Sequence, residues 1–248
     1  MEIILTVDKL CKNGIINQVS FEVGKGEMVA IMGPSGSGKS TLLYNISGMD
    51  RPDSGSVMLD HKELTDLTED EKASLRLHEM GFVFQQMNMM ENLNIIDNIL
   101  LPAVQANKEK RRDKSNKKEL AARAKKLMEK LSIAGLEERR ITEVSGGQLQ
   151  RACICRSLMN QPKILFADEP TGALNKSASN EVMKTLVSLN REGTTILMVT
   201  HDSRMASCCR RILYLVDGQI HGELIIQDMK TAKEREAYVN EWLAKREW

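Results

Sequence analysis

A glycine-rich run that ends in lysine and serine has the composition of a phosphate-binding turn. It reads Gly33-Pro-Ser-Gly-Ser-Gly-Lys-Ser40 and matches the pattern G-x-x-x-x-G-K-[ST] in full. Glycines let a backbone wrap closely around phosphate oxygens, and loop amides at a helix N-terminus attract anions. We therefore expect a nucleotide to be contacted by Gly33, Pro34, Ser35, Gly36, Ser37, Gly38, Lys39, Ser40 and Thr41.

The context of this run favours a bound nucleotide over a ligand-free glycine turn. An apolar strand pattern, Met28–Met32, precedes it, and a helical pattern, Ser40–Ile46, follows. In this motif the lysine reaches the β- and γ-phosphates and the serine binds Mg²⁺. We expect Lys39 and Ser40 to have these roles.

Two adjacent carboxylates follow a second apolar run. Ile164–Ala167 predicts a buried strand that leads into Asp168 and Glu169. Carboxylates at the end of a buried strand are costly unless they have a partner, and a metal-bound nucleotide is one. We expect Asp168 to hold Mg²⁺, through a water molecule. Strand alternation then points Glu169 the other way, which suits a general base or water-orienting group; an ordinary acidic turn is the alternative.

Two glycines near the start of a predicted helix are unusual. Ser145-Gly-Gly-Gln148 opens the helical segment Ser145–Met159, with Ser145 as the N-cap. Glycine disfavours helices, and close approach of an anion to the helix N-terminus would explain Gly146 and Gly147. A flexible N-cap without a ligand is the alternative.

These motifs together resemble the ABC ATPase family. Its signature LSGGQ lies between the phosphate loop and the acidic strand, and here Val144 replaces the leucine. The order of features also matches over residues 1–222: phosphate loop, Gln85 after a strand, Ser145–Gln148, Asp168–Glu169, Thr171–Asn175 and His201.

The resemblance implies ATP hydrolysis with Mg²⁺. Gln85 would contact Mg²⁺ or the attacking water and sense the transport partner, and His201 would bond the γ-phosphate. The implied catalytic residues are Glu169, His201, Gln85 and Lys39, and the implied metal contacts are Ser40, Gln85 and Asp168. The family also implies a head-to-tail dimer with a second copy, in which Ser145, Gly146, Gly147 and Gln148 close over the partner's ATP.

The chain departs from the family pattern at two places. No aromatic residue occurs in Leu10–Ile16, where the family has one that stacks on adenine, so we expect Ile15 or Ile16 to pack on the base and ATP to be only weakly preferred over GTP. Asn175 replaces an aspartate that couples the two sites of the dimer. Asparagine keeps the size but loses the charge, so we expect weaker coupling between the sites.

The elements that position these residues predict an α/β fold: a P-loop NTPase core with an N-terminal antiparallel β portion and an inserted helical subdomain. The alternation of apolar runs and helical patterns indicates a largely parallel sheet. The expected strands are Ile3–Val7, Val19–Val23, Met28–Met32, Val57–Leu59, Gly81–Phe84, Ile164–Ala167, Thr195–Val199 and Ile212–Val216. We expect one domain over residues 1–225, a helical subdomain at about 90–160, and a helical extension at 226–248.

Composition excludes several classes of protein. The net charge of +1 gives no field that would draw the chain to nucleic acid, and 42% hydrophobic residues can build a substantial core. Five cysteines, without metal-site spacing, fit free thiols in a reducing compartment. Neither a leader nor a membrane-spanning run is expected, so any membrane role requires a partner.

Three segments have both a structural and a partner-binding interpretation. Gln86–Met90 is rich in methionine, which suits either core filling or an adaptable docking surface. The basic stretch 108–126 is either a solvated helix face or a contact with anionic lipid. In the tail, Tyr238 with Trp242 and Val239 with Leu243 are at i,i+4 spacing, which fits packing on the core or docking of a partner.

Within the family, Ala167–Leu174 and Gly26–Ala30 are similar to the macrolide-exporter and lipoprotein-release branch, which includes bacitracin-type antimicrobial-peptide resistance transporters. This implies a motor at the cytoplasmic face of the cell membrane, peripheral through a polytopic permease. A soluble role in translation or DNA repair fits less well, because the chain has one phosphate loop and a short helical insertion. A nucleotide-driven regulator of a non-transporting membrane complex stays open as the alternative.

Overall fold

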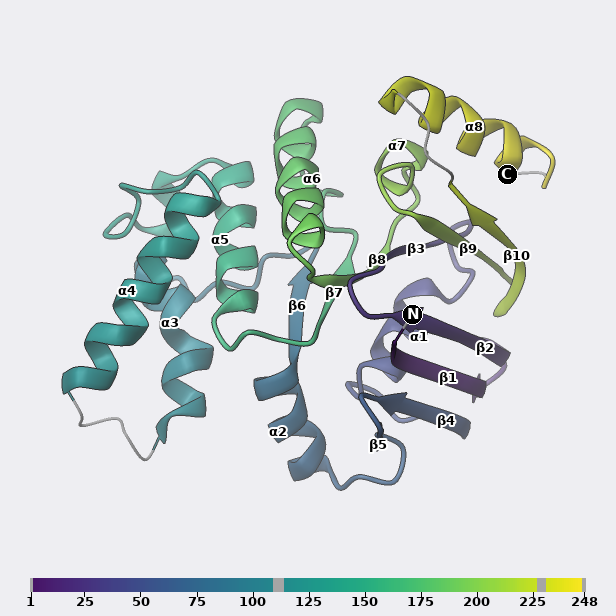
Figure 1. Cartoon of the computed structure of the whole chain (residues 1–248), viewed down its shortest axis with the longest axis horizontal. Coiled ribbons are helices and arrows are strands. Elements are labelled where there is room, and N and C mark those ends of the chain that lie inside the picture. The colour runs from purple at the N-terminus through teal and green to yellow at the C-terminus, as the bar shows by residue number, and fades with distance from the viewer. Residues whose placement is uncertain (1, 109–113, 227–230, 247–248) are drawn as a thin grey trace.

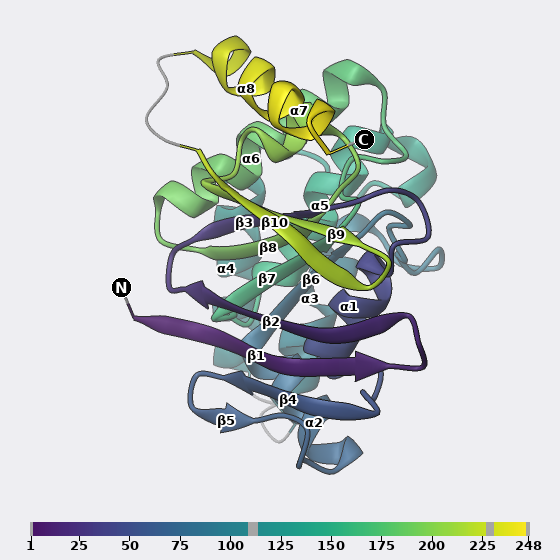
Figure 2. The same ribbon diagram turned by 90° about the vertical axis from the view of Figure 1, so that its right-hand side faces the viewer.

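The computed structural model describes residues 2–108, 114–226 and 231–246. Their strands form a four-stranded sheet, order β2-β1-β4-β5, and a six-stranded sheet, order β10-β9-β3-β8-β7-β6. Figure 2 shows the smaller sheet below the larger one, with α8 at the opposite end. The predicted α/β core with an N-terminal antiparallel portion is confirmed.

The six-stranded sheet contains the strands that carry the site. They are β3 (Met28–Met32), β6 (Met80–Phe84), β7 (Ile164–Asp168), β8 (Thr195–Val199), β9 (Arg211–Val216) and β10 (Gln219–Ile225). All are parallel except β10, which pairs antiparallel with β9 at the edge. The sequence analysis did not identify β10, because its polar and apolar residues mark an exposed edge strand rather than a buried run.

The smaller sheet is entirely antiparallel. It contains β1 (Ile3–Lys12), β2 (Ile16–Gly24), β4 (Ser54–Leu59) and the two-residue β5 (Lys62–Glu63). The first three strands extend beyond the apolar runs that predicted them. Part of the reason is irregular pairing: the β1–β2 register shifts between Val7 and Leu10, where Lys9 has a φ of 46°.

Each central strand divides its side chains between two cores. In β3, Met28, Ala30 and Met32 face a core shared with the helices, whereas Val29 and Ile31 face a core shared with the small sheet. This division follows from side-chain alternation along a strand. It explains why the strand is a continuous apolar run and why helices and a second sheet cover its two faces.

Several helices connect the strands. They are α1 (Lys39–Ile46), α2 (Glu69–Glu79), α6 (Lys176–Arg191) and the short α7 (Ser203–Ala206). Of these, only α1 was assigned a range from sequence. The start of α2 has a clear local cause: the Thr68 side chain accepts from the Glu71 amide, and the Glu71 side chain accepts from the Thr68 amide.

The described residues between β6 and β7 form three α-helices, a 3₁₀ turn (Ile141–Glu143) and no strand. The α-helices are α3 (Ile95–Ala106), α4 (Lys114–Lys130) and α5 (Gly146–Leu158), which lie together at one side of the molecule in Figure 1. Ser145 is the N-cap of α5, as predicted. Residues 109–113 of the basic stretch lie outside the described residues, and the described lysines 117, 118, 125 and 126 are exposed on α4.

The tail packs on the core. In α8 (Ala232–Ala244), Val239 and Leu243 are buried, and the Trp242 ring meets Tyr214 edge-on. Residues 227–230 and 247–248, part of the predicted extension, lie outside the described residues.

The methionine-rich segment Gln86–Met90 fits both of its interpretations in part. Met89 packs against the core, whereas Met90 is exposed.

All five cysteines are free, as expected. Burial raises the pKa of Cys153 to about 11 and that of Cys155 to about 12.

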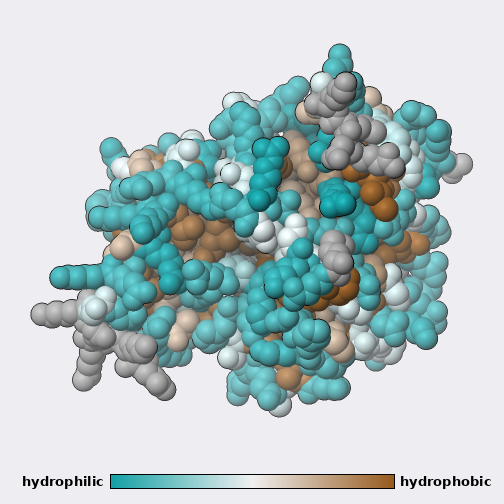
Figure 3. Space-filling view, viewed as in Figure 1, coloured by the Kyte–Doolittle hydropathy of each residue, from teal (hydrophilic) through white to brown (hydrophobic). Residues whose placement is uncertain are grey.

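None of the described helices has the length and apolar character of a membrane span. On the face seen in Figure 3, apolar surface is broken into areas separated by hydrophilic side chains.

A fully buried amide fixes the chain between β6 and α3. The Asn98 Oδ1 accepts from the Met90 amide at 2.7 Å, and Nδ2 donates to the carbonyls of Met90, Leu93 and Asn94 at 3.0, 3.3 and 3.0 Å. Asn98→Ala leaves these groups unpaired, so we expect it to lower the free energy of unfolding by about 2–3 kcal/mol in urea titrations.

Asn107→Ala is the matched control, because within the described part of the chain the Asn107 side chain donates only to the Ala103 carbonyl of the preceding helical turn. We expect this change to cost less than about 1 kcal/mol. Equal losses for the two variants would contradict the structural role of Asn98.

Candidate functional site

The glycine-rich loop connects β3 to the N-terminus of α1. Gly38 is the N-cap, with a φ of 94° that favours glycine. At Gly33 an added Cβ would lie 2.0 Å from the Leu215 carbonyl oxygen of β9, so only glycine fits. The backbone amides at the start of α1 have no side-chain cap, which leaves them available for an anionic ligand.

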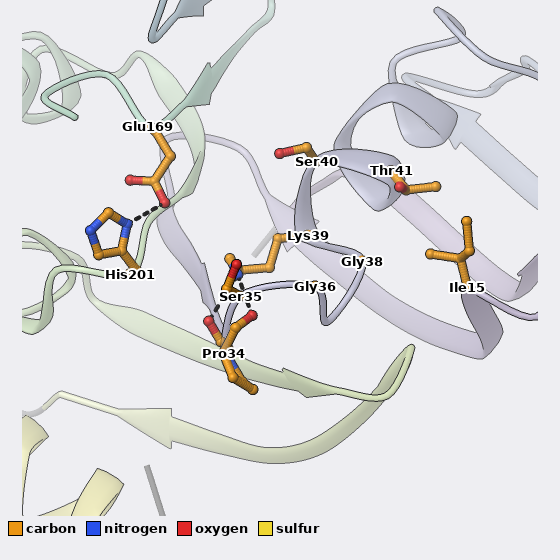
Figure 4. Close-up of a pocket in the computed structure, with 11 residues that line it drawn as sticks. Ile15, Pro34, Ser35, Gly36, Gly38, Lys39, Ser40, Thr41, Glu169 and His201 are labelled. Atoms are coloured by element: carbon orange, nitrogen blue, oxygen red, sulfur yellow. Dashed lines mark hydrogen bonds and ion pairs between the residues drawn. The ribbon is translucent and has the colours of Figure 1, made fainter. Parts of the chain in front are cut away.

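Lys39 folds back over this loop. Its Nζ donates to the carbonyl oxygens of Gly33 at 2.8 Å and Pro34 at 2.7 Å, as Figure 4 shows. Burial lowers the pKa of the Lys39 ammonium, and the nearby Glu169 and Asp168 carboxylates oppose that effect. The ammonium is thus held at the mouth of the loop by two carbonyls that a phosphate oxygen can replace.

The Asp168 carboxylate accepts hydrogen bonds from two hydroxyls of α1. Ser40 Oγ lies 3.0 Å from Oδ1 and Tyr44 Oη lies 2.9 Å from Oδ2. Mg²⁺ prefers oxygen ligands, and a serine hydroxyl beside a carboxylate supplies them. In nucleotide sites the protein gives one or two ligands, and phosphates and water complete the coordination. Tyr44 was not predicted as a site residue, although its i,i+4 spacing from Ser40 places both on one face of α1.

Glu169 turns away from Asp168 to a different partner. Strand β7 ends at Asp168, and Glu169 has a φ of 47°, so a left-handed turn rather than strand alternation sets its direction. Its Oε1 lies 2.8 Å from His201 Nδ1. A carboxylate only accepts, so Nδ1 carries the proton of this bond. The Glu169 side chain is 15% exposed and that of His201 is 67% exposed.

The phosphate loop, Lys39, Ser40, Glu169 and His201 share one cleft of about 600 Å³, whereas Asp168, hydrogen-bonded to Ser40, is not in its lining. The lining consists of Ile15, Gly33, Pro34, Ser35, Gly36, Gly38, Lys39, Ser40, Thr41, Glu169 and His201, of which Figure 4 labels all but Gly33. No aromatic ring is in that lining. Of the two isoleucines expected to meet the base, Ile15 lines the cleft and is 45% exposed, whereas Ile16 is buried. Ser37, also expected to contact nucleotide, is buried and is not in the cleft lining.

Gln85 lies beside the cleft rather than in its lining. It follows β6 and packs over Gly172, where an added Cβ would be 3.0 Å from Gln85 Nε2. The Gly172 amide donates to the Glu169 carbonyl at 3.0 Å. Gln85 therefore contacts the turn that follows Glu169, and among the described residues it makes no hydrogen bond to Ser40 or Asp168.

Residues Ser145–Gln148 do not line the cleft of their own chain. Ser145 and Gln148 bond each other's side chains and amides at the start of α5. The glycines have a reason within the chain that the sequence analysis did not foresee: added Cβ atoms would lie 3.1 Å from Leu174 at Gly146 and 2.9 Å from Ala178 at Gly147. These glycines thus allow close packing of α5 against the start of α6.

Asn175 caps α6. Its Oδ1 accepts from the Ala178 amide at 2.9 Å, a bond that an aspartate would also make. Asparagine in place of the aspartate typical of the family therefore keeps the cap of α6 and removes only the negative charge.

Comparison with known proteins gives concordant results. The profile of the family described as "ABC transporter" matches residues 16–172. The ABC transporter ATP-binding protein YxdL of Bacillus subtilis is 42% identical over 210 residues, covering 84% of this chain and 79% of that protein. The macrolide export ATP-binding/permease protein MacB of Mannheimia succiniciproducens is 43% identical over 206 residues, covering 83% of this chain. The chain spans about a third of that longer protein, 31%.

A solved structure has the same fold. It is a dimeric ATP-binding cassette in a post-hydrolysis state bound to ADP and Pi, with a TM-score of 0.77 and 33% identity. The match covers 91% of this chain and 100% of that one.

The absence of a ring from the cleft lining predicts weak base selectivity, with ATP bound only slightly better than GTP. Ile15→Tyr supplies a ring at an exposed position of the lining. We expect it to raise ATP affinity about tenfold, since a stacked base contributes ~1–3 kcal/mol. Nucleotide titrations monitored by fluorescence measure both effects. Ile15→Leu is the control and should change nothing. A large ATP preference in the unmodified chain would refute this account.

Proposed function

The chain belongs to the ABC transporter family, and we propose that it is the ATP-hydrolysing subunit that powers a separate membrane permease. The observation that carries this proposal is the convergence on one cleft of the phosphate loop, Lys39, Ser40 and the Glu169–His201 pair. ATP hydrolysis needs a phosphate cradle, a metal contact and a group that orients water. Each has a candidate within this arrangement.

We assign phosphate binding to the loop and Lys39. The loop amides and the N-terminus of α1 bind the phosphates. Lys39 exchanges the Gly33 and Pro34 carbonyls for the β- and γ-phosphate oxygens. This exchange costs little free energy, because the Lys39 ammonium gives up two carbonyl oxygens and gains charged phosphate oxygens, which form stronger hydrogen bonds with it.

We assign Mg²⁺ to Ser40 and Asp168, whose Oγ and Oδ1 atoms lie 3.0 Å apart. The ion would neutralise charge on the phosphates. Asp168 would contact it through water, and Gln85, which packs over Gly172, would be a further contact for the ion or for the attacking water. No cluster of three His, Cys, Asp or Glu side chains suited to a metal occurs among the described residues, which fits an ion held mainly by nucleotide and water.

Glu169 is the proposed general base or water-orienting residue. Its hydrogen bond to His201 holds the carboxylate at the edge of the cleft. In this proposal His201, mostly exposed, has a proton on each ring nitrogen, so that it donates through Nδ1 to Glu169 and through Nε2 to a γ-phosphate oxygen. Together with Lys39 it stabilises the charge that develops during attack by water.

A second copy of the chain completes the site. Ser145, Gly146, Gly147 and Gln148 do not line the cleft of their own chain, and the helix N-terminus they form suits a phosphate from another subunit. The solved cassette that this chain resembles is described as dimeric. ATP thus joins two subunits head to tail, and hydrolysis separates them. We further propose one catalytic domain over residues 1–225, with a helical subdomain at about 90–160.

The permease needs a docking surface, and a groove between α2, β6, α3 and α5 is the candidate. It has a volume of about 480 Å³, and its lining includes Phe82, Phe84, Leu101, Arg156 and Asn160. Leu101 is 39% exposed. The groove adjoins the strand that ends before Gln85, so a docked segment of the permease can act on the cleft through Gln85 and the turn at Gly172.

The relatives indicate the branch of the family. One is named as a macrolide exporter with ATP-binding and permease parts, and another as a syringafactin export protein. We propose export of, or resistance to, antimicrobial peptides or similar amphiphiles, by mechanical transmission to a polytopic permease. The chain would then lie at the cytoplasmic face of the cell membrane. Control of a cell-wall enzyme or sensor kinase through a non-transporting membrane protein is the alternative.

Capture from membranes tests the proposal. Tagged Glu169→Gln protein, incubated with ATP and solubilised native membranes, should recover a polytopic permease identified by mass spectrometry. Adding Leu101→Asp should abolish recovery by placing a charge in the groove. Ile225→Asp, the same kind of change at an apolar residue that is 58% exposed on β10, should leave recovery intact.

Recovery of ribosomal or DNA-processing proteins without a membrane protein would contradict the transporter assignment. A recovered membrane protein bound to a cell-wall enzyme or sensor kinase, and without transport activity, would favour the regulatory alternative. Equal recovery with Leu101→Asp would remove the groove from the interface.

A further inference from the structure

Both oxygens of the Asp168 carboxylate are held by one helix. Ser40 and Tyr44 lie one turn apart on α1, and their hydroxyls reach Oδ1 and Oδ2 at 3.0 and 2.9 Å. Asp168 is 8% exposed, so water does little to orient it. None of the roles proposed above for phosphate binding, metal binding or water activation uses the hydrogen bond from Tyr44 to Asp168.

The phenol of Tyr44 is the donor in this contact. A carboxylate only accepts, so the Tyr44 hydroxyl donates the hydrogen bond to Asp168 Oδ2. The ring packs against the core beneath the small sheet. The Tyr44 carbonyl accepts from the amides of Met49 and Asp50, which anchors this part of the helix end.

We propose that Tyr44 is a positioning residue for the metal site: its hydroxyl fixes Asp168 so that Oδ1 faces Ser40 and the Mg²⁺ of bound nucleotide. The inference rests on the proposed function, because it requires that MgATP is the ligand. The Tyr44 oxygen bonds the carboxylate oxygen that Ser40 does not use. When Ser40 turns its oxygen to the ion, Tyr44 remains the contact that keeps the carboxylate from rotating.

Two effects of this hydrogen bond oppose each other. Donation by the phenol withdraws charge from Asp168, which weakens its attraction for a cation, whereas orientation of the carboxylate strengthens it. Removal of hydrogen-bond partners behind metal ligands lowers metal affinity about 10–100-fold. Orientation therefore dominates, and loss of the Tyr44 hydroxyl should weaken the dependence of nucleotide binding on Mg²⁺.

Mg²⁺-dependent nucleotide binding tests the inference without catalysis. Tyr44→Phe is made in the Glu169→Gln chain, and binding of a fluorescent ATP analogue is measured in EDTA and across a Mg²⁺ titration. We expect unchanged affinity in EDTA and about a tenfold rise in the Mg²⁺ concentration for half-maximal effect. Tyr238→Phe removes the same hydroxyl from a residue that is 38% exposed on α8 and is the control.

A second variant separates positioning from general damage. In the Asp168→Asn chain, Tyr44→Phe should cause no further change, because the hydroxyl acts through the carboxylate. A merely structural role would instead lower the melting temperature and weaken binding equally with and without Mg²⁺, which would overturn the inference. So would an unchanged Mg²⁺ titration.

The outcome also distinguishes failure of this inference from failure of the proposed function. If Mg²⁺ has no effect on nucleotide binding by the Tyr238→Phe control, the assignment of the metal site itself is wrong. If Mg²⁺ acts normally on the control and equally on Tyr44→Phe, only the role of Tyr44 is wrong.

Discussion

A backbone hydrogen bond just beyond the end of β7 determines the arrangement of the site. The Glu169 amide donates to the Val199 carbonyl at 3.0 Å, which completes the last β7–β8 pair, Asp168 with Val199. The Thr200 amide donates to the Ile31 carbonyl of β3 at 3.1 Å. The ends of three parallel strands are thereby held in register. Because the phosphate loop, Glu169 and His201 each follow one of these ends, the register brings them to a single cleft.

The turn at Glu169 then separates two neighbouring carboxylates. A positive φ for a non-glycine residue is strained, and such strain recurs at functional sites. Here it sends Glu169 toward His201, while Asp168, still within the strand, faces α1. Two like charges that are adjacent in sequence thus obtain different partners. This separation lets one act on the metal side of a nucleotide and the other on water.

Features that depend on residues close together along the chain could be predicted from the sequence, whereas contacts between residues far apart along the chain could not. The phosphate loop, the cap at Ser145 and most strands were predictable, because local spacing and buried apolar runs encode them. The bond between Tyr44 and Asp168 joins residues 124 positions apart, and no local pattern announces it. Strand β10 was missed because it is an exposed edge. The packing reason for Gly147 depends on Ala178, which only the fold brings near.

The central claim is that Glu169 acts on water and not on nucleotide binding. Single-turnover hydrolysis by Glu169→Gln tests this most directly, with MgATP affinity measured on the same protein and Glu129→Gln on the exposed face of α4 as the control. The account predicts unchanged MgATP affinity and hydrolysis slower by at least about a hundredfold, the contribution of a general base. Near-normal hydrolysis by Glu169→Gln would contradict it.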